Sequence, residues 1–151
     1  MVTSYTIRYG VWMKLVLDTD AIVAAVQSER GASRELLLRI VVGELAAGVS
    51  VPLLLDYEAV LKRPAQLAAS GLSTADIDVF LDEIAAVMEH VRLFFLWRLA
   101  LRDAGDDMVL ETAVNGGADC IVTFNDADFG AAPSRFGIAV IRPGPLLGSL
   151  P

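Results

Sequence analysis

The sequence predicts an α/β fold of the three-layer α/β/α sandwich type, with a central, mainly parallel sheet. Two observations support this prediction. Apolar runs without polar alternation, such as KLVLD at residues 14–18 and DCIVTF at residues 119–124, are typical of strands buried on both faces. Stretches with a helical period of apolar residues separate these runs, and strands that alternate with helices form parallel sheets.

The expected elements follow one another without a long linker. We expect strands at residues 14–18, 49–55, 91–96, 119–124 and 137–141. We expect helices at residues 19–28, 32–47, 56–63, 74–88 and 106–115. Gly48 is expected to end the second helix, and Ser73 is a plausible N-cap for the fourth. Because parallel strands share a carboxyl edge, a functional site is expected at that edge.

Length and composition suit one folded domain. The chain has 151 residues, of which 55% are hydrophobic and 21% charged, which argues against disorder. We expect an N-terminal extension at residues 1–13 and one domain at residues 14–151. No apolar run is long enough to cross a bilayer. The single cysteine, Cys120, is expected to be a buried thiol, which is compatible with a reducing cytoplasm. The mean hydropathy of +0.56 predicts a buried interface with a partner or in a homodimer.

The negative charge is concentrated in one stretch of the chain. The formal net charge is −7, from 19 acids and 12 bases. Residues 103–128 contain seven of the acids and no base, so the remaining 12 acids balance the 12 bases. This distribution disfavours broad electrostatic binding of nucleic acid. It is compatible with an enzyme that reaches phosphate through metal ions.

Asp18 and Glu58 are the first two candidate site residues. Asp18 closes the first predicted strand, although it could also serve as an ordinary helix N-cap. Glu58 lies four residues after Leu54 and three before Leu61, which predicts an inward side chain with Asp56 turned elsewhere. The alternative for Glu58 is a solvated surface position.

Asp106 and the turn after the fourth strand complete the candidate set. Asp106 is predicted to project from the apolar face of its helix, near a helix N-terminus whose dipole favours the ionised form. Helix capping is the alternative. Thr123, Asn125 and Asp128 follow a predicted strand directly, and a simple polar turn is the alternative there.

The candidate residues together favour a metal site over a nucleophile system. Clustered carboxylates repel one another unless a cation is present, and oxygen ligands select Mg²⁺ or Mn²⁺. His90 is the only histidine, so a Ser-His or Cys-His system is not expected. The phosphate-binding patterns GxGxxG and GxxxxGK[ST] do not occur.

Four segments resemble the PIN-domain nucleases, and most closely the VapC-like toxins of toxin–antitoxin pairs. They are LVLDTDAIVAA at 15–25, VPLLLDYEAVLKRP at 51–64, LRDAGDDMVLETAVNGGADCIVTFNDADF at 101–129 and RFGIAVIRPGPLL at 135–147. The resemblance implies a metal-dependent endoribonuclease that cleaves single-stranded RNA with Mg²⁺ or Mn²⁺ and is controlled by an antitoxin protein. It implies metal ligation by Asp18, Glu58 and Asp106, a fourth catalytic position at Asn125, and support from Thr123 and Asp128.

Two positions depart from the pattern of this family. Asp20 stands where relatives often have Asn, and Asn125 stands where many have Asp. The change at Asn125 leaves open a non-catalytic, PIN-like binding scaffold. A phosphatase of the haloacid dehalogenase type is a further alternative, prompted by the acids around Asp18 and Asp106, with Lys62 as its lysine.

Overall fold

A five-stranded parallel sheet forms the centre of the computed structural model, which describes residues 7–8, 11–94 and 104–150. The strands lie in the order β5-β4-β3-β6-β7. Their bounds are β3 Lys14–Leu17, β4 Ala46–Val49, β5 Glu89–His90, β6 Cys120–Val122 and β7 Ala139–Ile141. Each neighbouring pair in the sheet is parallel.

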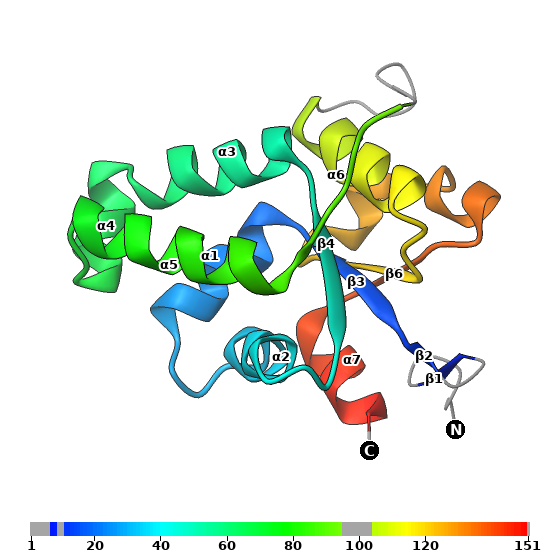
Figure 1. Cartoon of the computed structure of the whole chain (residues 1–151), viewed down its shortest axis with the longest axis horizontal. Helices are drawn as coiled ribbons and strands as arrows, with labels where there is room; N and C mark the ends of the chain where they lie inside the picture. Colours follow the sequence, from blue (N-terminus) through cyan, green and yellow to red (C-terminus); the bar gives the residue numbers. More distant parts are fainter. Residues whose placement is uncertain (1–6, 9–10, 95–103, 151) are drawn as a thin grey trace.

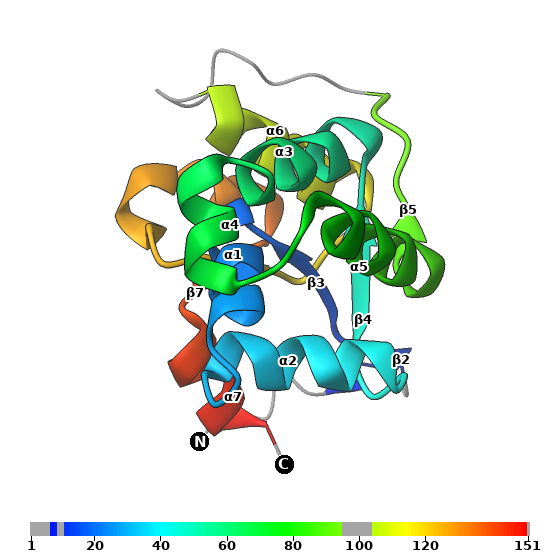
Figure 2. The same cartoon turned by 90° about the vertical axis from the view of Figure 1, so that its left-hand side faces the viewer.

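Helices cover both faces of the sheet. Their bounds are α1 Thr19–Gln27, α2 Ala32–Val41, α3 Val51–Leu61, α4 Pro64–Ser70, α5 Thr74–Val87, α6 Ala104–Asn115 and α7 Pro143–Ser149. Figure 1 shows α3 and α6 above the strands and α2 and α7 below them. In the turned view the strands lie between α3 and α6 above and α2 and α7 below (Figure 2). The predicted three-layer α/β/α architecture is confirmed. Within the described part of the chain, every helix is too short or too polar to cross a bilayer.

The order of the strands defines a switch point beside β3. From β3 the chain moves outward through β4 to β5, and it then returns through α6 to place β6 on the other side of β3. In open parallel sheets, ligands bind outside the carboxyl ends of the strands where the chain changes direction in this way. Asp18 follows β3 and Thr123 follows β6, so both lie at this point.

The second helix ends earlier than predicted, and the second strand both begins and ends earlier. Residues 42–45 are a turn, Gly48 lies within β4 instead of ending a helix, and the strand is over at Val49. Residues 51–55, predicted as strand, are the first turns of α3. The cause is Ser50, whose hydroxyl accepts the Leu53 N–H (3.4 Å) as an N-cap, with proline in the first helical turn.

Smaller differences occur at the N-terminus and at the third strand. The expected extension contains two short strands that pair antiparallel, β1 Ile7–Arg8 and β2 Val11–Trp12, and Met13 is already buried in the core. The structure has the two-residue strand β5 at Glu89–His90 in place of the strand predicted at residues 91–96. Residues 91–94 are not strand, and residues 95–96 lie outside the described part of the chain. Cys120 is buried as predicted; burial, followed by the charge of Asp119, raises the pKa of its thiol to about 12.

The Ser50 cap provides a test of where α3 begins. Ser50 is buried, and its hydroxyl also bonds the hydroxyl of Thr112 on α6 (2.7 Å). We expect Ser50→Ala to lower the free energy of unfolding by about 1–2 kcal/mol, because it removes a cap and a buried hydrogen bond. Urea denaturation measures the loss. Ser73→Ala is the matched control at the exposed N-cap of α5 and should cost less; an equal or smaller cost at Ser50 would contradict the assignment.

Candidate functional site

Asp18 is the buried acid at the centre of the carboxyl edge. Its backbone N–H continues the sheet by donating to the Val122 carbonyl (2.9 Å), and its side chain is only 8% exposed. One carboxylate oxygen accepts the Thr19 N–H (2.8 Å) and the other accepts the Thr123 hydroxyl (2.7 Å). The structure therefore combines both expectations, because Asp18 is the N-cap of α1 and also faces the loop after β6.

Asp56 on α3 reaches the same place from a different element. The Thr19 hydroxyl donates to Asp56 Oδ2 at 2.5 Å. Thr19 thus bonds Asp18 through its backbone N–H and Asp56 through its side chain. Two carboxylates, 38 positions apart in sequence, are held around one buried residue.

Tyr57, the neighbour of Asp56, ties α3 to the end of β3. Its ring is fully buried, and its hydroxyl donates to the Leu17 carbonyl at 2.5 Å. The pairing of β3 with β4 covers only Lys14 and Leu15 of β3. Beyond these residues, the Leu17 carbonyl accepts its hydrogen bond from Tyr57 on α3. Burial, and then the charges of Asp18 and Asp56, raise the pKa of Tyr57 well above its usual value, which keeps its hydroxyl protonated as a donor.

Glu58 lies on the opposite side of α3 from Asp56, so its predicted orientation is wrong. It accepts the Lys62 ammonium at 3.0 Å, and Lys62 also bonds Asp78 on α5 at 2.5 Å. These hydrogen bonds, from Asp78 first and Glu58 second, raise the pKa of Lys62. Glu58 lines a hollow of about 150 Å³ between α3 and α5.

The start of α3 explains this difference. Helical residues two apart point about 200° from each other, so Asp56 and Glu58 cannot share a side. The inward stripe is Leu53, Tyr57 and Leu61, spaced four residues apart, instead of the predicted stripe through Leu54. Recognising Ser50 as an N-cap would have identified this stripe and placed Asp56 at the site.

The turn after β6 brings Thr123 and Asn125 to the site, as expected. Thr123 is fully buried, and its hydroxyl accepts the Asn125 N–H (3.0 Å) while donating to Asp18. Asn125 is exposed, and its side-chain amide donates to Asp20 Oδ2 at 3.0 Å. Asp20, predicted only to add charge beside the site, is therefore bound directly to the turn.

Asp20 combines burial with a carboxylate charge. Its Oδ2 also accepts the Phe124 N–H (3.1 Å), whereas its Oδ1 is buried and accepts no hydrogen bond from a described residue. Burial is the largest influence and raises the pKa of Asp20. The Phe124 N–H and the Thr123 hydroxyl act in the opposite direction. The ionised form of Asp20 is thus only partly stabilised by the protein.

Asp128, which is predicted to support the site, makes its described hydrogen bond within the turn after β6. Its side chain is exposed, and its backbone N–H donates to the Asn125 carbonyl at 3.0 Å. Among the described residues, no hydrogen bond joins its side chain to Asp18, Asp20 or Asp56. Any support from Asp128 is therefore through the fold of the turn, which the buried Phe129 anchors.

Asp106 lies in the first turn of α6, and its side chain is outside the described part of the structure. The Lys14 ammonium donates to the Gly116 carbonyl (2.9 Å), which places the end of α6 at the amino end of β3. A 12-residue helix is about 18 Å long, so the Asp106 backbone lies toward the opposite, carboxyl edge. The described side chains by themselves contain no group of three acids, histidines or cysteines arranged to hold a metal ion.

Comparisons with known proteins identify the family. The sequence matches the profile of the PIN domain over residues 14–127. The chain belongs to the PIN-domain family. A search of curated proteins found no significant match.

Two solved structures show the same fold at low sequence identity. VapBC2 from Rickettsia felis, bound to a DNA fragment from its promoter, superposes with a TM-score of 0.61 at 15% identity, over 86% of this chain and 98% of the other. FitAB, bound to an IR36 DNA fragment, superposes with a TM-score of 0.56 at 12% identity, over 85% of this chain and 94% of the other.

The Tyr57 hydroxyl can be tested separately from the acids. We expect Tyr57→Phe to fold to the same structure but to lower the free energy of unfolding by about 1–3 kcal/mol, because the buried Leu17 carbonyl loses its donor. Guanidinium denaturation followed by circular dichroism measures this. Unchanged stability would show that the hydrogen bond does not hold α3 against β3.

Proposed function

We propose that this PIN-domain protein is a metal-dependent endoribonuclease that cleaves single-stranded RNA. The observation that carries the proposal is the pair of acids held around Thr19. Asp18 comes from the end of β3 and Asp56 from α3, and each is fixed by a hydrogen bond to that one residue. Asp106 is the third proposed acid, at the start of α6.

The chemistry of these donors fits Mg²⁺ or Mn²⁺. The donors proposed are carboxylate oxygens alone, and such sets select hard divalent cations over zinc. Asp20 Oδ1 is buried and accepts no hydrogen bond from a described residue, so this part of the chain leaves that carboxylate oxygen unsatisfied. When bound, the ion would activate water near neutral pH and offset charge on the phosphoryl group.

The residues of the chain itself provide a rigid setting for this reaction. Asp18, Asp56 and Asp106 would hold the ion, and the hydroxyls of Thr19 and Thr123 fix the first two carboxylates. With an ion held by these carboxylates, the site would need no histidine as general base. Because the edge is acidic, phosphate would be repelled without the cation, so RNA binding should require metal.

The position of Lys62 counts against the phosphatase alternative. That mechanism needs a lysine beside the first acid, whereas the Lys62 ammonium bonds Glu58 and Asp78 between α3 and α5. The other alternative, a non-catalytic binding scaffold, is tested by the next experiment.

Asp56→Asn and Glu58→Gln form a matched pair that tests the site. We expect Asp56→Asn to lower Mn²⁺-dependent cleavage of a single-stranded RNA by about 100-fold or more, as Asp18→Asn should, because a ligand charge is lost. Glu58→Gln should stay within about threefold of the unchanged protein. A fluorescently labelled RNA with a time-resolved gel assay measures the rates.

The pair also distinguishes the alternatives. Loss of activity in Glu58→Gln with retention in Asp56→Asn would restore the original prediction for Glu58. An unchanged protein that neither binds Mn²⁺ in calorimetry nor cleaves RNA would support the scaffold.

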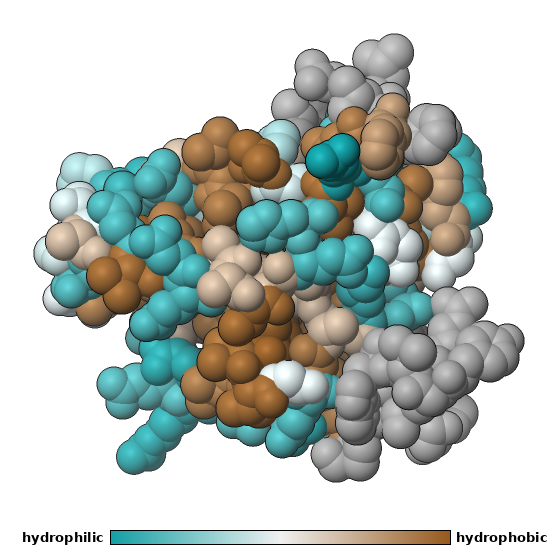
Figure 3. All heavy atoms as spheres, viewed as in Figure 1, coloured by the Kyte–Doolittle hydropathy of each residue, from teal (hydrophilic) through white to brown (hydrophobic). Residues whose placement is uncertain are grey.

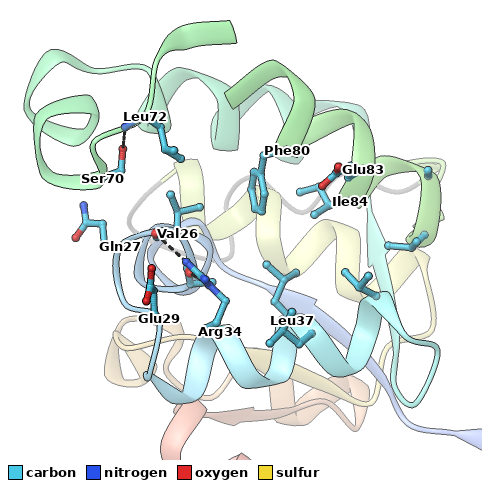
Figure 4. A pocket seen from close by; sticks show the side chains of 15 residues that line it. Val26, Gln27, Glu29, Arg34, Leu37, Ser70, Leu72, Phe80, Glu83 and Ile84 are labelled. Carbon is cyan, nitrogen blue, oxygen red and sulfur yellow. Dashed lines mark hydrogen bonds between the residues drawn. The ribbon is translucent and has the colours of Figure 1, made fainter. Parts of the chain in front are cut away.

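We further propose that the protein is the cytoplasmic toxin of a type II toxin–antitoxin pair, with an antitoxin helix bound in an apolar groove. The groove holds about 750 Å³ and lies between α2 and α5. Figure 4 shows Leu37 and Val26 on one wall facing Phe80 and Ile84 on the other. Apolar side chains also gather over α2 in the lower centre of Figure 3.

The shape and charge of the groove indicate the kind of segment that fits it. An apolar channel between two helices accepts the apolar face of an amphipathic helix. Glu29 and Glu83 line the groove, whereas the Arg34 guanidinium is bonded to the carbonyls of Ala25 and Val26 at the end of α1. We therefore expect basic residues to flank the apolar face of the bound helix.

Val41→Asp and Val79→Asp test this surface with a matched pair of exposed helical valines. Val41 lines the groove and is 46% exposed, whereas Val79 on α5 is 57% exposed and does not line it. The probe is the purified product of the adjacent gene. We expect Val41→Asp to weaken its binding by about tenfold or more in calorimetry, and Val79→Asp to leave it unchanged.

Equal losses in the two variants, or no loss at Val41, would exclude the groove as the binding site. Gel filtration of the protein alone tests the homodimer predicted from its mean hydropathy.

A further inference from the structure

Arg142 is a base at the carboxyl edge of the sheet, among the acids. It directly follows β7, the neighbour of β6. The Thr123 N–H donates to the Ile141 carbonyl (3.1 Å), which places the backbone of Arg142 beside the residue whose hydroxyl bonds Asp18 (2.7 Å). The buried Pro143 restricts Arg142 to an extended backbone. The base of the Arg142 side chain is therefore fixed next to the proposed site.

One carboxylate orients the guanidinium of Arg142. Its Nε donates to Asp126 Oδ1 (3.1 Å), and the two side chains are 56% and 46% exposed. Among the described residues, this is the one hydrogen bond that the guanidinium makes. A guanidinium has five N–H donors, so the four on its two terminal nitrogens are left for a ligand. Such a fork of donors matches two oxygens of a phosphate group.

The turn after β6 connects Arg142 to the acids. Asp20 accepts the Phe124 N–H (3.1 Å) and the Asn125 side-chain amide (3.0 Å), and the next residue along, Asp126, bonds Arg142. Burial raises the pKa of Asp20, and the charge of Arg142 is among the influences that lower it. The guanidinium therefore lies within electrostatic reach of Asp20 as well as in contact with Asp126.

Several other bases are engaged away from this edge. The Lys14 ammonium donates to the Gly116 carbonyl (2.9 Å) at the amino end of β3. The Lys62 ammonium bonds two acids between α3 and α5, and the Arg34 guanidinium bonds carbonyls at the end of α1. Arg142, in contrast, combines a place at the carboxyl edge with terminal nitrogens that no described residue engages.

We propose that Arg142 binds a phosphate of the RNA backbone beside the proposed active site, with its guanidinium held in place by Asp126. This inference rests on the proposed function, because it takes single-stranded RNA as the ligand. A contact of this kind positions the strand and carries no base specificity. It also offsets part of the repulsion between the RNA and the acidic edge.

Variants of Arg142 that remove or keep the charge test the proposal by RNA binding. Arg142→Gln keeps a donor for Asp126 but loses the charge, and we expect it to weaken binding by about fivefold or more. The slope of log affinity against log salt should become about 0.7 shallower, the change for one phosphate contact in a single strand. Arg142→Lys keeps the charge but not the fork, so it should lose about twofold with an unchanged slope. Fluorescence anisotropy of a labelled single-stranded RNA, read in Mn²⁺ before cleavage proceeds, measures the affinities.

Arg135→Gln is the matched control. Arg135 is exposed in the 3₁₀ helix Pro133–Phe136, which precedes β7, whereas Arg142 follows the carboxyl end of the same strand. The affinity of this control should stay within about twofold of that of the unchanged protein. In cleavage assays, Arg142→Gln should raise KM and leave kcat within about threefold, because a phosphate contact is made before and during the reaction.

The remaining outcomes are also decisive. Unchanged affinity in Arg142→Gln, equal losses in Arg142→Gln and Arg135→Gln, or a loss with an unchanged salt slope would overturn the phosphate contact. If circular dichroism shows that Arg142→Gln does not fold, Arg142→Lys decides: near-normal affinity and slope support the contact, and a shallower slope overturns it. If the unchanged protein binds RNA without cleaving it, the proposed function fails, and these affinities still decide the role of Arg142. Absence of RNA binding would overturn both.

Discussion

The burial of Asp18 at the carboxyl end of β3 is the constraint on which the rest of the site depends. A carboxylate that is 8% exposed must be given donors or a cation. The Thr19 N–H and the Thr123 hydroxyl supply donors, and they link the start of α1 to the loop after β6. The same Thr19 then orients Asp56 from α3. The packing of α1, α3 and the loop after β6 is therefore coupled to the position of the Asp18 carboxylate.

The beginning of α3 decides which acid joins Asp18. Because Ser50 caps the helix and Tyr57 faces inward to bond the Leu17 carbonyl, Asp56 turns toward Thr19 and Glu58 turns toward Lys62. With the helix predicted to start five residues later, the apolar pattern pointed Glu58 inward and Asp56 away from the site. Local capping chemistry, and not the apolar pattern alone, selects the second acid.

The sequence predicted the sandwich and the approach of Asp18, Thr123 and Asn125 at the carboxyl edge, since strand ends and parallel pairing follow from apolar runs. It failed at residues 42–55, where an apolar stretch can be strand or helix and Gly48 resembled a helix stop. It also did not predict the hydrogen bond between Asp20 and Asn125. The two departures from the family pattern, Asp20 and Asn125, contact each other at 3.0 Å, and no sequence period indicates a contact across 105 positions.

The location of Mn²⁺ in a crystal soaked with that ion tests the central claim most directly. Anomalous diffraction at a wavelength where Mn²⁺ scatters strongly would position the ion independently of any activity. The account predicts a peak between the carboxylates of Asp18 and Asp56. A peak in the hollow beside Glu58 and Asp78, or no peak at the carboxyl edge of the sheet at saturating Mn²⁺, would contradict it.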